Sequence, residues 1–279
     1  MDNFEKSKQI SEKMKQCLTT YADLIGTQDP SKKKRYGFVP GLDLSSEAKV
    51  LEEQVRKLEE GVFQVMFTGG FSAGKSTLLN ALMHKDILRT AITAETAVIT
   101  RIIFGHEEKV IVELKGRDQA TGENKFRTMS VTRFFQDYRV DQDNPQKFSD
   151  IDYVVLQQEE DGIGGNLVQL VDSPGTENSV EDTLTARRFA SQADAIVHLI
   201  NGTMPFVEGD KEYIANHYAG KHMRNLFFVI NRWDSLNEKE RADTKEAARK
   251  HLQEVFTDES GRFDEELFTS RVFYTAAYH

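Results

Sequence analysis

The sequence predicts an α/β fold: a mostly parallel central sheet flanked by helices, with a helical hairpin before it. After Gly61, short apolar runs of the β type alternate with helical patterns, which is typical of βαβ units. Three of these runs, LVQLVD, AIVHLI and NLFFVIN, are hydrophobic on nearly every residue. Because such strands need cover on both faces, they indicate the inner strands of a parallel sheet.

Composition excludes several classes of protein. The 279 residues are 39% hydrophobic and 29% charged, which excludes a collagen-like or wholly disordered chain. The formal net charge is −9, so we expect no nucleic-acid partner. With Cys17 as the only cysteine, no internal disulfide can form. No stretch approaches the ~18 apolar residues of a membrane span, and the start lacks a secretory signal, so we expect a cytoplasmic chain.

The first 60 residues predict a helical segment separate from the rest. Apolar residues recur at steps of three and four over 4–25, which predicts one amphipathic helix. Residues 26–43 hold prolines and glycines without a period, and the serines that follow can cap a second helix over 48–58. We therefore expect a helical hairpin over 1–60 and a second domain over 61–279.

Apolar runs predict the strands of this second domain. They lie at 62–68, 99–104, 109–115, 153–157, 167–172, 195–200, 225–231 and 271–276. Between 116 and 152 the chain is polar, with one helix predicted near 130–138, which indicates an insertion on the first half of the sheet.

The strongest motif is GGFSAGKST over 69–77, which has the pattern G-x-x-x-x-G-K-[ST] between a predicted strand and a predicted helix. In that setting, backbone N–H groups and the helix N-terminus converge on a polyphosphate. Lys75 is expected to reach the β and γ oxygens, and the Ser76 hydroxyl to bind Mg²⁺. The predicted nucleotide-binding residues of this loop are Gly70, Phe71, Ser72, Ala73, Gly74, Lys75, Ser76 and Thr77.

A second motif, VDSPG, ends at Gly175 and follows an apolar strand. Asp172 could hold Mg²⁺ through water, and the Gly175 N–H could bond a γ-phosphate. Taken alone, an Asp before a Pro-Gly turn is more often turn chemistry. Its place downstream of a P-loop and on a buried strand favours the functional interpretation.

A third motif, NRWD, predicts the choice of base. The carboxylate of Asp234 can accept from both N1–H and the 2-amino group of guanine, a donor pair that adenine lacks, and Asn231 can brace the base and the loop. Arg232 stands where such loops usually have Lys, and its stem can still cover one face of the base. After the last strand, the Ala276 N–H of YTAA could meet the guanine O6. Each of these last two motifs is weak alone.

The order of the motifs carries more information than any one of them. P-loop, D-x-x-G, N-x-x-D and a final small-residue loop each follow an apolar run, in the order that a GTPase needs. The sequence therefore predicts a P-loop GTPase G domain. Its first switch should hold a Thr for Mg²⁺ and the γ-phosphate, and the stretch TAITAETAVIT over 90–100 offers four candidates that residue chemistry leaves open.

The chain resembles the dynamin superfamily, especially bacterial dynamin-like proteins and the mitofusin-like branch. The resemblance covers about 45–279 and rests on GGFSAGKS, TAVIT, the long insertion and the segment TMPFVEGDKEYI. It selects Thr96 as the switch I residue and a further ligand of Mg²⁺. It also implies that the first 60 residues are neck helices, and that this chain is the N-terminal part of a longer protein with a stalk and a lipid-binding tip.

The resemblance further implies how the site works. Ser72 would contact the nucleotide and help to hold a monovalent cation, K⁺ or Na⁺, and hydrolysis of GTP to GDP would be stimulated when two G domains meet. The implied catalytic residues are Ser72, Lys75, Thr96 and Gly175. Two positions depart from familiar patterns: Phe71 stands where eukaryotic dynamins have Gln, and Thr176, not Gln, follows Gly175.

Three classes of function stay open. The first is a GTPase that couples G-domain homodimerisation to membrane remodelling, peripheral to a membrane that other regions of the protein contact. The second is a low-turnover GTP-gated assembly or partner-binding module, which Phe71 keeps open. The third is an ATPase or P-loop kinase, against which Asn231 and Asp234 argue.

Overall fold

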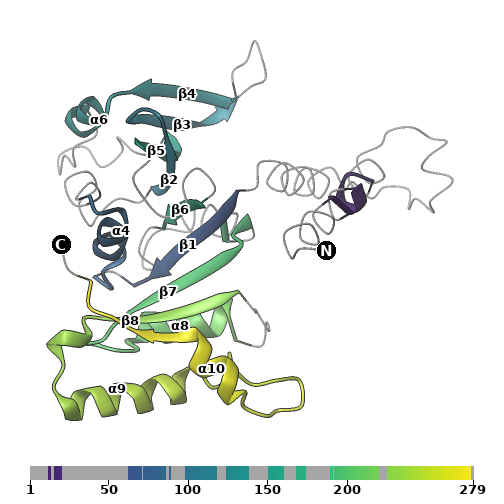
Figure 1. The fold of residues 1–279 in the computed structure, drawn as a ribbon, viewed down its shortest axis with the longest axis vertical. Helices are drawn as coiled ribbons and strands as arrows, with labels where there is room; N and C mark the ends of the chain where they lie inside the picture. The colour runs from purple at the N-terminus through teal and green to yellow at the C-terminus, as the bar shows by residue number, and fades with distance from the viewer. Residues whose placement is uncertain are drawn as a thin grey trace, which may run out of the picture. The chain divides into compact units, whose positions relative to one another are not determined.

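The chain forms two compact units, Met1–Phe63 and Gln64–His279. The computed structural model (Figure 1) describes residues 12–13, 16–20, 62–70, 72–85, 88, 98–117, 124–137, 150–159, 168–173, 189–190, 192–219 and 225–277. In the first unit, 12–13 and 16–20 are helical, within the helix predicted over 4–25. The remainder of the predicted hairpin, and the predicted boundary between residues 60 and 61, lie outside the described residues.

The second unit is built on a nine-stranded sheet with the order β4-β3-β5-β2-β6-β1-β7-β8-β9. The strands are β1 (Phe63–Gly69), β2 (Ile99–Gly105), β3 (Lys109–Arg117), β4 (Asn124–Met129), β5 (Ile151–Glu159), β6 (Val168–Asp172), β7 (Ala195–Asn201), β8 (Leu226–Asn231) and β9 (Val272–Tyr274). β1, β7, β8 and β9 pair in parallel, as do β2 and β5. The antiparallel pairs, β2 with β6 and β3 with β4 and β5, gather in the other half.

The sheet confirms the predicted α/β class and each predicted strand. One strand was missed: β4, whose sequence NKFRTM lies inside the predicted insertion. Residues 125–128 of β4 are exposed, so this edge strand lacks the apolar alternation by which strands are predicted. The helix predicted near 130–138 is α6 (Val131–Asp137).

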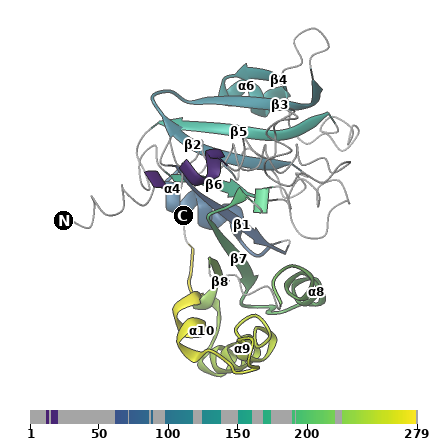
Figure 2. The same ribbon diagram turned by 90° about the vertical axis from the view of Figure 1, so that its right-hand side faces the viewer.

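Helices cover the sheet on both faces (Figures 1 and 2). They are α4 (Lys75–Met83), α6, α8 (Glu208–His217), the 3₁₀ turn η3 (Trp233–Ser235), α9 (Glu238–His251) and α10 (Glu265–Arg271). α9 begins with a capping box in which Asn237 and Glu240 exchange hydrogen bonds of 2.8 and 3.0 Å between side chain and backbone. Within the described residues, no helix is both long and apolar enough to cross a bilayer.

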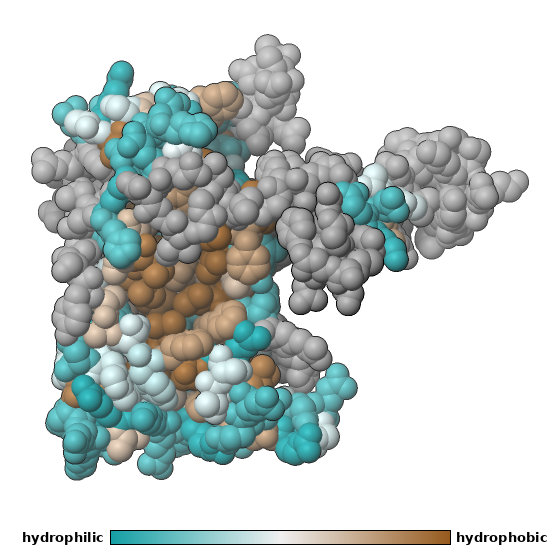
Figure 3. Space-filling view, viewed as in Figure 1, coloured by the Kyte–Doolittle hydropathy of each residue, from teal (hydrophilic) through white to brown (hydrophobic). Residues whose placement is uncertain are grey.

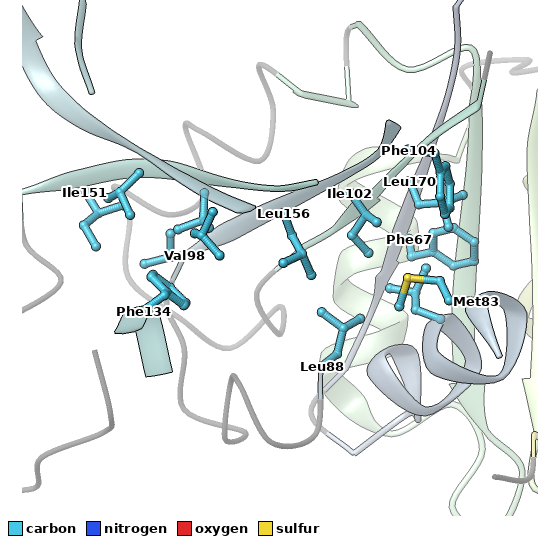
Figure 4. Packing of buried hydrophobic residues seen from close by; sticks show 14 of the residues in the cluster. Phe67, Met83, Leu88, Val98, Ile102, Phe104, Phe134, Ile151, Leu156 and Leu170 are labelled. Atoms are coloured by element: carbon cyan, nitrogen blue, oxygen red, sulfur yellow. The ribbon is translucent and has the colours of Figure 1, made fainter. Parts of the chain in front are cut away.

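Two main apolar cores fix the helices to the sheet. In one, side chains of β1, β2, β5 and β6 meet Met83 of α4 and Phe134 of α6 (Figure 4). In the other, alternate residues of β7 and β8 such as Ile196, Phe228 and Ile230 meet residues of α8 and α9. Because Phe67 of β1 belongs to the first core, the loop that follows this strand starts from a rigid base.

The face of β7, β8 and β9 opposite α8 and α9 is less completely covered. Val197 and Val229 are only partly buried there, and Phe273 is 48% exposed. Figure 3 shows apolar surface, in brown, across the centre of the molecule. Below this area in the view, the surface is mostly hydrophilic and drawn in teal.

Candidate nucleotide-binding site

The predicted motifs meet at one edge of the sheet. The loop of 70–74 follows β1, Asp172 ends β6, and Asn231 ends β8. The segment of 275–277 follows β9, which pairs in parallel with β8. The carboxyl ends of parallel strands share an edge, and ligands of open α/β sheets bind there.

Two glycines let the chain pass between β1 and α4. Gly69 has φ 136°, and a Cβ on it would lie 2.3 Å from the backbone oxygen of Leu199. Gly74 has φ 91°, and a Cβ there would lie 2.3 Å from Nδ2 of Asn231. No side chain caps the N-terminus of α4 at Gly74, so its first N–H groups are available to an anion.

Lys75 is folded back over the loop. Its Nζ donates to the carbonyl oxygens of Gly69 at 2.8 Å and Gly70 at 3.1 Å. Burial lowers the pKa of Lys75, while the charges of Asp172 and Asp210 act to raise it. The ammonium group is therefore held by dipoles and carboxylates at the place where a polyphosphate would arrive.

Ser76 and Asp172 form a pair suited to Mg²⁺. Ser76 Oγ donates to Oδ2 of Asp172 at 3.1 Å, and within the described residues the buried Oδ1 of Asp172 has no hydrogen-bond partner. Burial raises the pKa of Asp172 to about 6, against the charge of Lys75 and the bond from Ser76. A hydroxyl beside a carboxylate with a spare oxygen fits Mg²⁺, which usually takes one or two protein ligands plus phosphates and water.

Asn231 joins three segments of the site. This side chain is 2% exposed, and its Nδ2 donates to the carbonyl oxygen of Ala73 at 3.2 Å. Its Oδ1 accepts from the backbone N–H of Arg232 at 2.8 Å and of Ala277 at 3.2 Å. One amide therefore ties the P-loop, its own loop and the segment after β9 together.

The side chain of Arg232 also contacts the P-loop, at Ser72. Arg232 has φ 59°, and its Nη2 donates to the carbonyl oxygen of Ser72 at 3.3 Å. Ser72 itself has φ 61°. Two neighbouring non-glycine residues in the left-handed region are uncommon, and such conformations concentrate at functional sites.

The predicted base-reading residue Asp234 is exposed at the rim of the site, in η3. Beside it, the ring of Trp233 packs on Tyr274 with centroids 4.4 Å apart. Arg241 and Lys245 lie 5.6 and 5.8 Å from the Trp233 ring centroid. The backbone N–H of Trp233 donates to Thr275 at 3.0 Å, so the base loop and the last loop are held together.

The other predicted residues divide into two groups. Thr77 lies in the first turn of α4, and Ala276 lies between residues that bond the base loop. Phe71, Thr96 and Gly175 lie outside the described residues. The chemical roles assigned to all of these residues stay predictions.

Sequence reasoning missed Asp210 of α8. This side chain is 4% exposed, and its Oδ1 would lie 3.1 Å from a Cβ placed on Gly70. The segment TMPFVEGDKEYI, noted for its resemblance, contained the residue. Nothing in the residue pattern indicates that Asp210 would approach the P-loop, because this contact depends on the docking of α8 against the sheet.

The fold and the site together define the class: an α/β P-loop domain whose motifs stand in the order of a GTPase. A family model described as the dynamin family matches residues 65–233, which is more than half of the chain. The chain therefore belongs to the dynamin family.

Relatives agree with this assignment. The chain is 24% identical over 284 residues to a bacterial dynamin-like protein of Nostoc punctiforme, covering 98% of this chain and 40% of that protein. It is 25% identical over 220 residues to mitofusin-2 of Homo sapiens, covering 77% and 28%. A solved structure of an oligomerised bacterial dynamin pair matches with a TM-score of 0.58 at 16% identity, over 95% of this chain and 46% of that one. The chain thus spans less than half the length of these relatives.

Proposed function

We propose that this chain binds GTP with Mg²⁺ and hydrolyses it to GDP. The observation that carries the proposal is the amide of Asn231, which joins the P-loop through Ala73 and the last loop through Ala277. The Asn231 side chain therefore connects the phosphate-binding loop to the loop that carries the proposed base-reading Asp234. A nucleotide that satisfies both ends is favoured over one that satisfies the phosphate end alone.

Lys75, Ser76 and Asp172 are the proposed phosphate and metal residues. When bound, Mg²⁺ would neutralise charge that develops on the β and γ oxygens. Ser76 would ligate it directly, and Asp172 would hold it through water. Lys75 would leave the carbonyl oxygens of Gly69 and Gly70 for the phosphate oxygens, a stronger set of acceptors.

Ser72, Thr96 and Gly175 are the proposed partners of the γ-phosphate and the attacking water. Phe71 has no group that can orient water, and Thr176 replaces the Gln of small switch GTPases. The backbone of Thr96 and Ser72 would then position the water, with K⁺ or Na⁺ near Ser72 compensating the charge.

A second copy of the chain is the proposed means of completing the site. Near the same edge, the segment between β7 and α8 exposes Met204 (63%) and Val207 (40%). Apolar groups beside a polar site favour a contact that excludes water. Two domains pressed together across their nucleotides would order both switches and convert binding energy into positioning.

Specific GTPase rate measured over a wide range of protein concentration tests this proposal. We expect turnover per molecule to rise with concentration and to be higher in K⁺ than in a buffer lacking K⁺ and Na⁺. Light scattering with GDP and a transition-state mimic should show a shift from monomer to dimer. A flat rate and a persistent monomer would contradict the dimer and favour the second candidate, a low-turnover GTP-gated module, for which Phe71 is the supporting residue. Binding of ATP as tight as GTP would contradict both.

We further propose that hydrolysis drives membrane remodelling in the complete protein, which would be peripheral to the membrane. The family assignment supports this, and the solved bacterial dynamin pair is described as a mechanism for long-range sensing and tethering of membranes. Lipid contact would come through regions beyond this chain. Vesicle binding by the longer protein, compared with this chain alone, tests the proposal.

A further inference from the structure

A buried polar group lies directly behind the P-loop. Thr68 Oγ1 is 3.0 Å from Nδ1 of His198 and 2.9 Å from the hydroxyl oxygen of Tyr218. Thr68 is 1% exposed, His198 0% and Tyr218 3%, so this network has no access to solvent. If the Tyr218 hydroxyl donates to Thr68 and Thr68 donates to Nδ1, each hydroxyl hydrogen serves one acceptor.

Burying this polar network costs more free energy than filling the same space with apolar side chains. Among the described residues, Nε2 of His198 has no hydrogen-bond partner, although the ring is packed against Tyr213, Tyr218 and Phe228. Burial lowers the pKa of His198 to about 3, so the ring is neutral. An apolar side chain of similar volume in place of His198 would avoid burying a ring nitrogen that has no hydrogen-bond partner. A polar network kept at this cost needs a reason other than packing.

Its position supplies that reason. Thr68 and His198 are register partners on the parallel strands β1 and β7, and the next pair is Gly69 with Leu199. At that pair the strands approach so closely that only glycine fits on β1. Gly69 is also the residue whose carbonyl oxygen receives Lys75 at 2.8 Å. Thr68 is the last residue with a side chain before Gly69. The hydrogen bonds of its hydroxyl therefore restrain the backbone whose carbonyl oxygen accepts from Lys75.

Tyr218 extends this restraint to α8. It follows the last residue of α8, and its backbone N–H closes the helix on Ile214 at 2.9 Å. The same helix places Asp210 beside Gly70. The start of the P-loop is thus held from both ends of one helix, and the hydroxyl of Tyr218 is one of these two points of contact.

We propose that Thr68, His198 and Tyr218 are positioning residues for GTP hydrolysis, which lock the end of β1 against β7 and α8 and so hold Lys75 in register with the β and γ phosphates. The proposal rests on the proposed GTPase function. It assigns no chemical step to the three residues. Their effect is geometric, and displacement by about 1 Å at a catalytic group can cost on the order of a hundredfold in rate.

Matched substitutions separate positioning from simple stability. Thr68→Val keeps the shape and removes the hydroxyl, whereas Thr68→Ser keeps the hydroxyl and removes a methyl group. Tyr218→Phe removes the other hydroxyl and keeps the ring. Thr244→Val is the control, because Thr244 is also buried, at 4% exposed, but lies on α9 away from the P-loop.

We expect Thr68→Val and Tyr218→Phe to lower kcat by about tenfold with a smaller change in KM, and Thr68→Ser to recover most of the rate. Thr244→Val should keep the wild-type rate per folded molecule even if its melting temperature falls. Full kcat in both Thr68→Val and Tyr218→Phe would overturn the proposal, as would loss of kcat in Thr68→Ser equal to that in Thr68→Val.

A binding measurement keeps this test independent of turnover. Lys75 acts on the β and γ phosphates, so its displacement should weaken a non-hydrolysable GTP analogue more than GDP. We expect the ratio of analogue to GDP affinity to fall several-fold in Thr68→Val and to be unchanged in Thr244→Val. If the wild-type chain binds GTP without hydrolysing it, the proposed hydrolysis fails while this ratio still tests the positioning role. An unchanged ratio in both hydroxyl-deleted variants would overturn that role.

Discussion

Single residues of this site serve several segments at once. The amide of Asn231 donates to Ala73 and accepts from Arg232 and Ala277. A buried amide with three hydrogen bonds gives rigidity, since loss of any one bond leaves a desolvated group behind. The loop that follows β8 is therefore tied to both the P-loop and the segment after β9.

Asp234 should decide which base is bound. Asp234→Asn replaces one acceptor by a donor opposite N1–H and the 2-amino group, so GTP binding should weaken by about 2–4 kcal/mol and xanthosine triphosphate should be favoured instead. Titration with fluorescent nucleotides measures both. Asp243→Asn, an exposed aspartate on α9, is the matched control. Unchanged GTP affinity in Asp234→Asn would contradict the assignment.

Lys75 and Thr96 should fail in different ways. Lys75→Ala removes the cation nearest the β and γ phosphates and should abolish tight binding of GTP. Thr96→Ala should leave GDP affinity nearly intact and suppress turnover, because Thr96 would act only while a γ-phosphate is present. Nucleotide titration and single-turnover assays distinguish the two. If Thr93→Ala showed the second pattern in place of Thr96→Ala, the predicted register of switch I would be wrong.

How much of the site the sequence could predict depends on how local the chemistry is. The P-loop could be predicted because a phosphate cradle needs glycine at fixed spacing, here Gly69 and Gly74, whatever the rest of the chain does. Asp210 and the network of Thr68, His198 and Tyr218 could not be predicted. Thr68 and Tyr218 are 150 residues apart, and the pairing of β1 with β7 and the packing of α8 bring these partners together.

At the scale of elements, strands were predictable where burial dictates their composition. β7 and β8 are buried or partly buried along their whole length and appear as continuous apolar runs. β4 is an exposed edge strand, so its side chains carry no such signal. The same reasoning explains why the insertion of 116–152 appeared to hold only a helix.

We expect the proposed Mg²⁺ site, where Ser76 of α4 meets Asp172 of β6, to be sensitive to pH. Burial raises the pKa of Asp172 to about 6. Below that pH the carboxyl group holds a proton that Mg²⁺ must displace, so the apparent Mg²⁺ affinity of the GTP complex should fall as the pH drops below about 6. Mg²⁺ titrations of bound fluorescent GTP above and below this pH measure the effect.

Asp172→Asn is the control for this titration. It keeps the shape of the side chain, cannot ionise, and retains the separate titration of the nucleotide. Its Mg²⁺ affinity should be weaker at neutral pH and should vary less with pH than that of the wild type. An equal pH dependence in both proteins would assign the effect to the nucleotide and contradict our prediction.

For the molecule as a whole, His198 links stability to acidity. Burial, together with the charges of Lys75 and His217, lowers its pKa to about 3. In the unfolded chain the ring takes up a proton near the ordinary pKa of about 6.5, while the folded chain does not until about pH 3. The free energy of unfolding should therefore fall as the pH drops through this window, by up to ~1.4 kcal/mol per pH unit.

Asp172 acts in the opposite sense, since a raised pKa makes the folded state bind the proton more tightly between about pH 4 and 6. Comparison with His198→Asn isolates the histidine. Urea unfolding at several pH values should give a steeper acid loss for the wild type than for the variant. Parallel curves would show that the ring is not kept neutral by folding.

The strand order also determines at what point in synthesis the proposed nucleotide-binding site can form. β1 is an inner strand of the sheet, yet its neighbours β6 and β7 come late in the chain, and the backbone N–H of Gln64 bonds the side chain of an aspartate 130 residues further on. The hydrogen bonds of the Asn231 side chain are complete only when Ala277 is in place. During synthesis the P-loop sequence emerges before β6 and β7, the strands that flank β1 in the sheet. Until they follow, the apolar strand β1 stays unpaired and is prone to aggregation. We therefore expect a chain that ends before Ala277 to bind nucleotide more weakly than one that includes it, because one of the acceptor contacts of Asn231 would be missing.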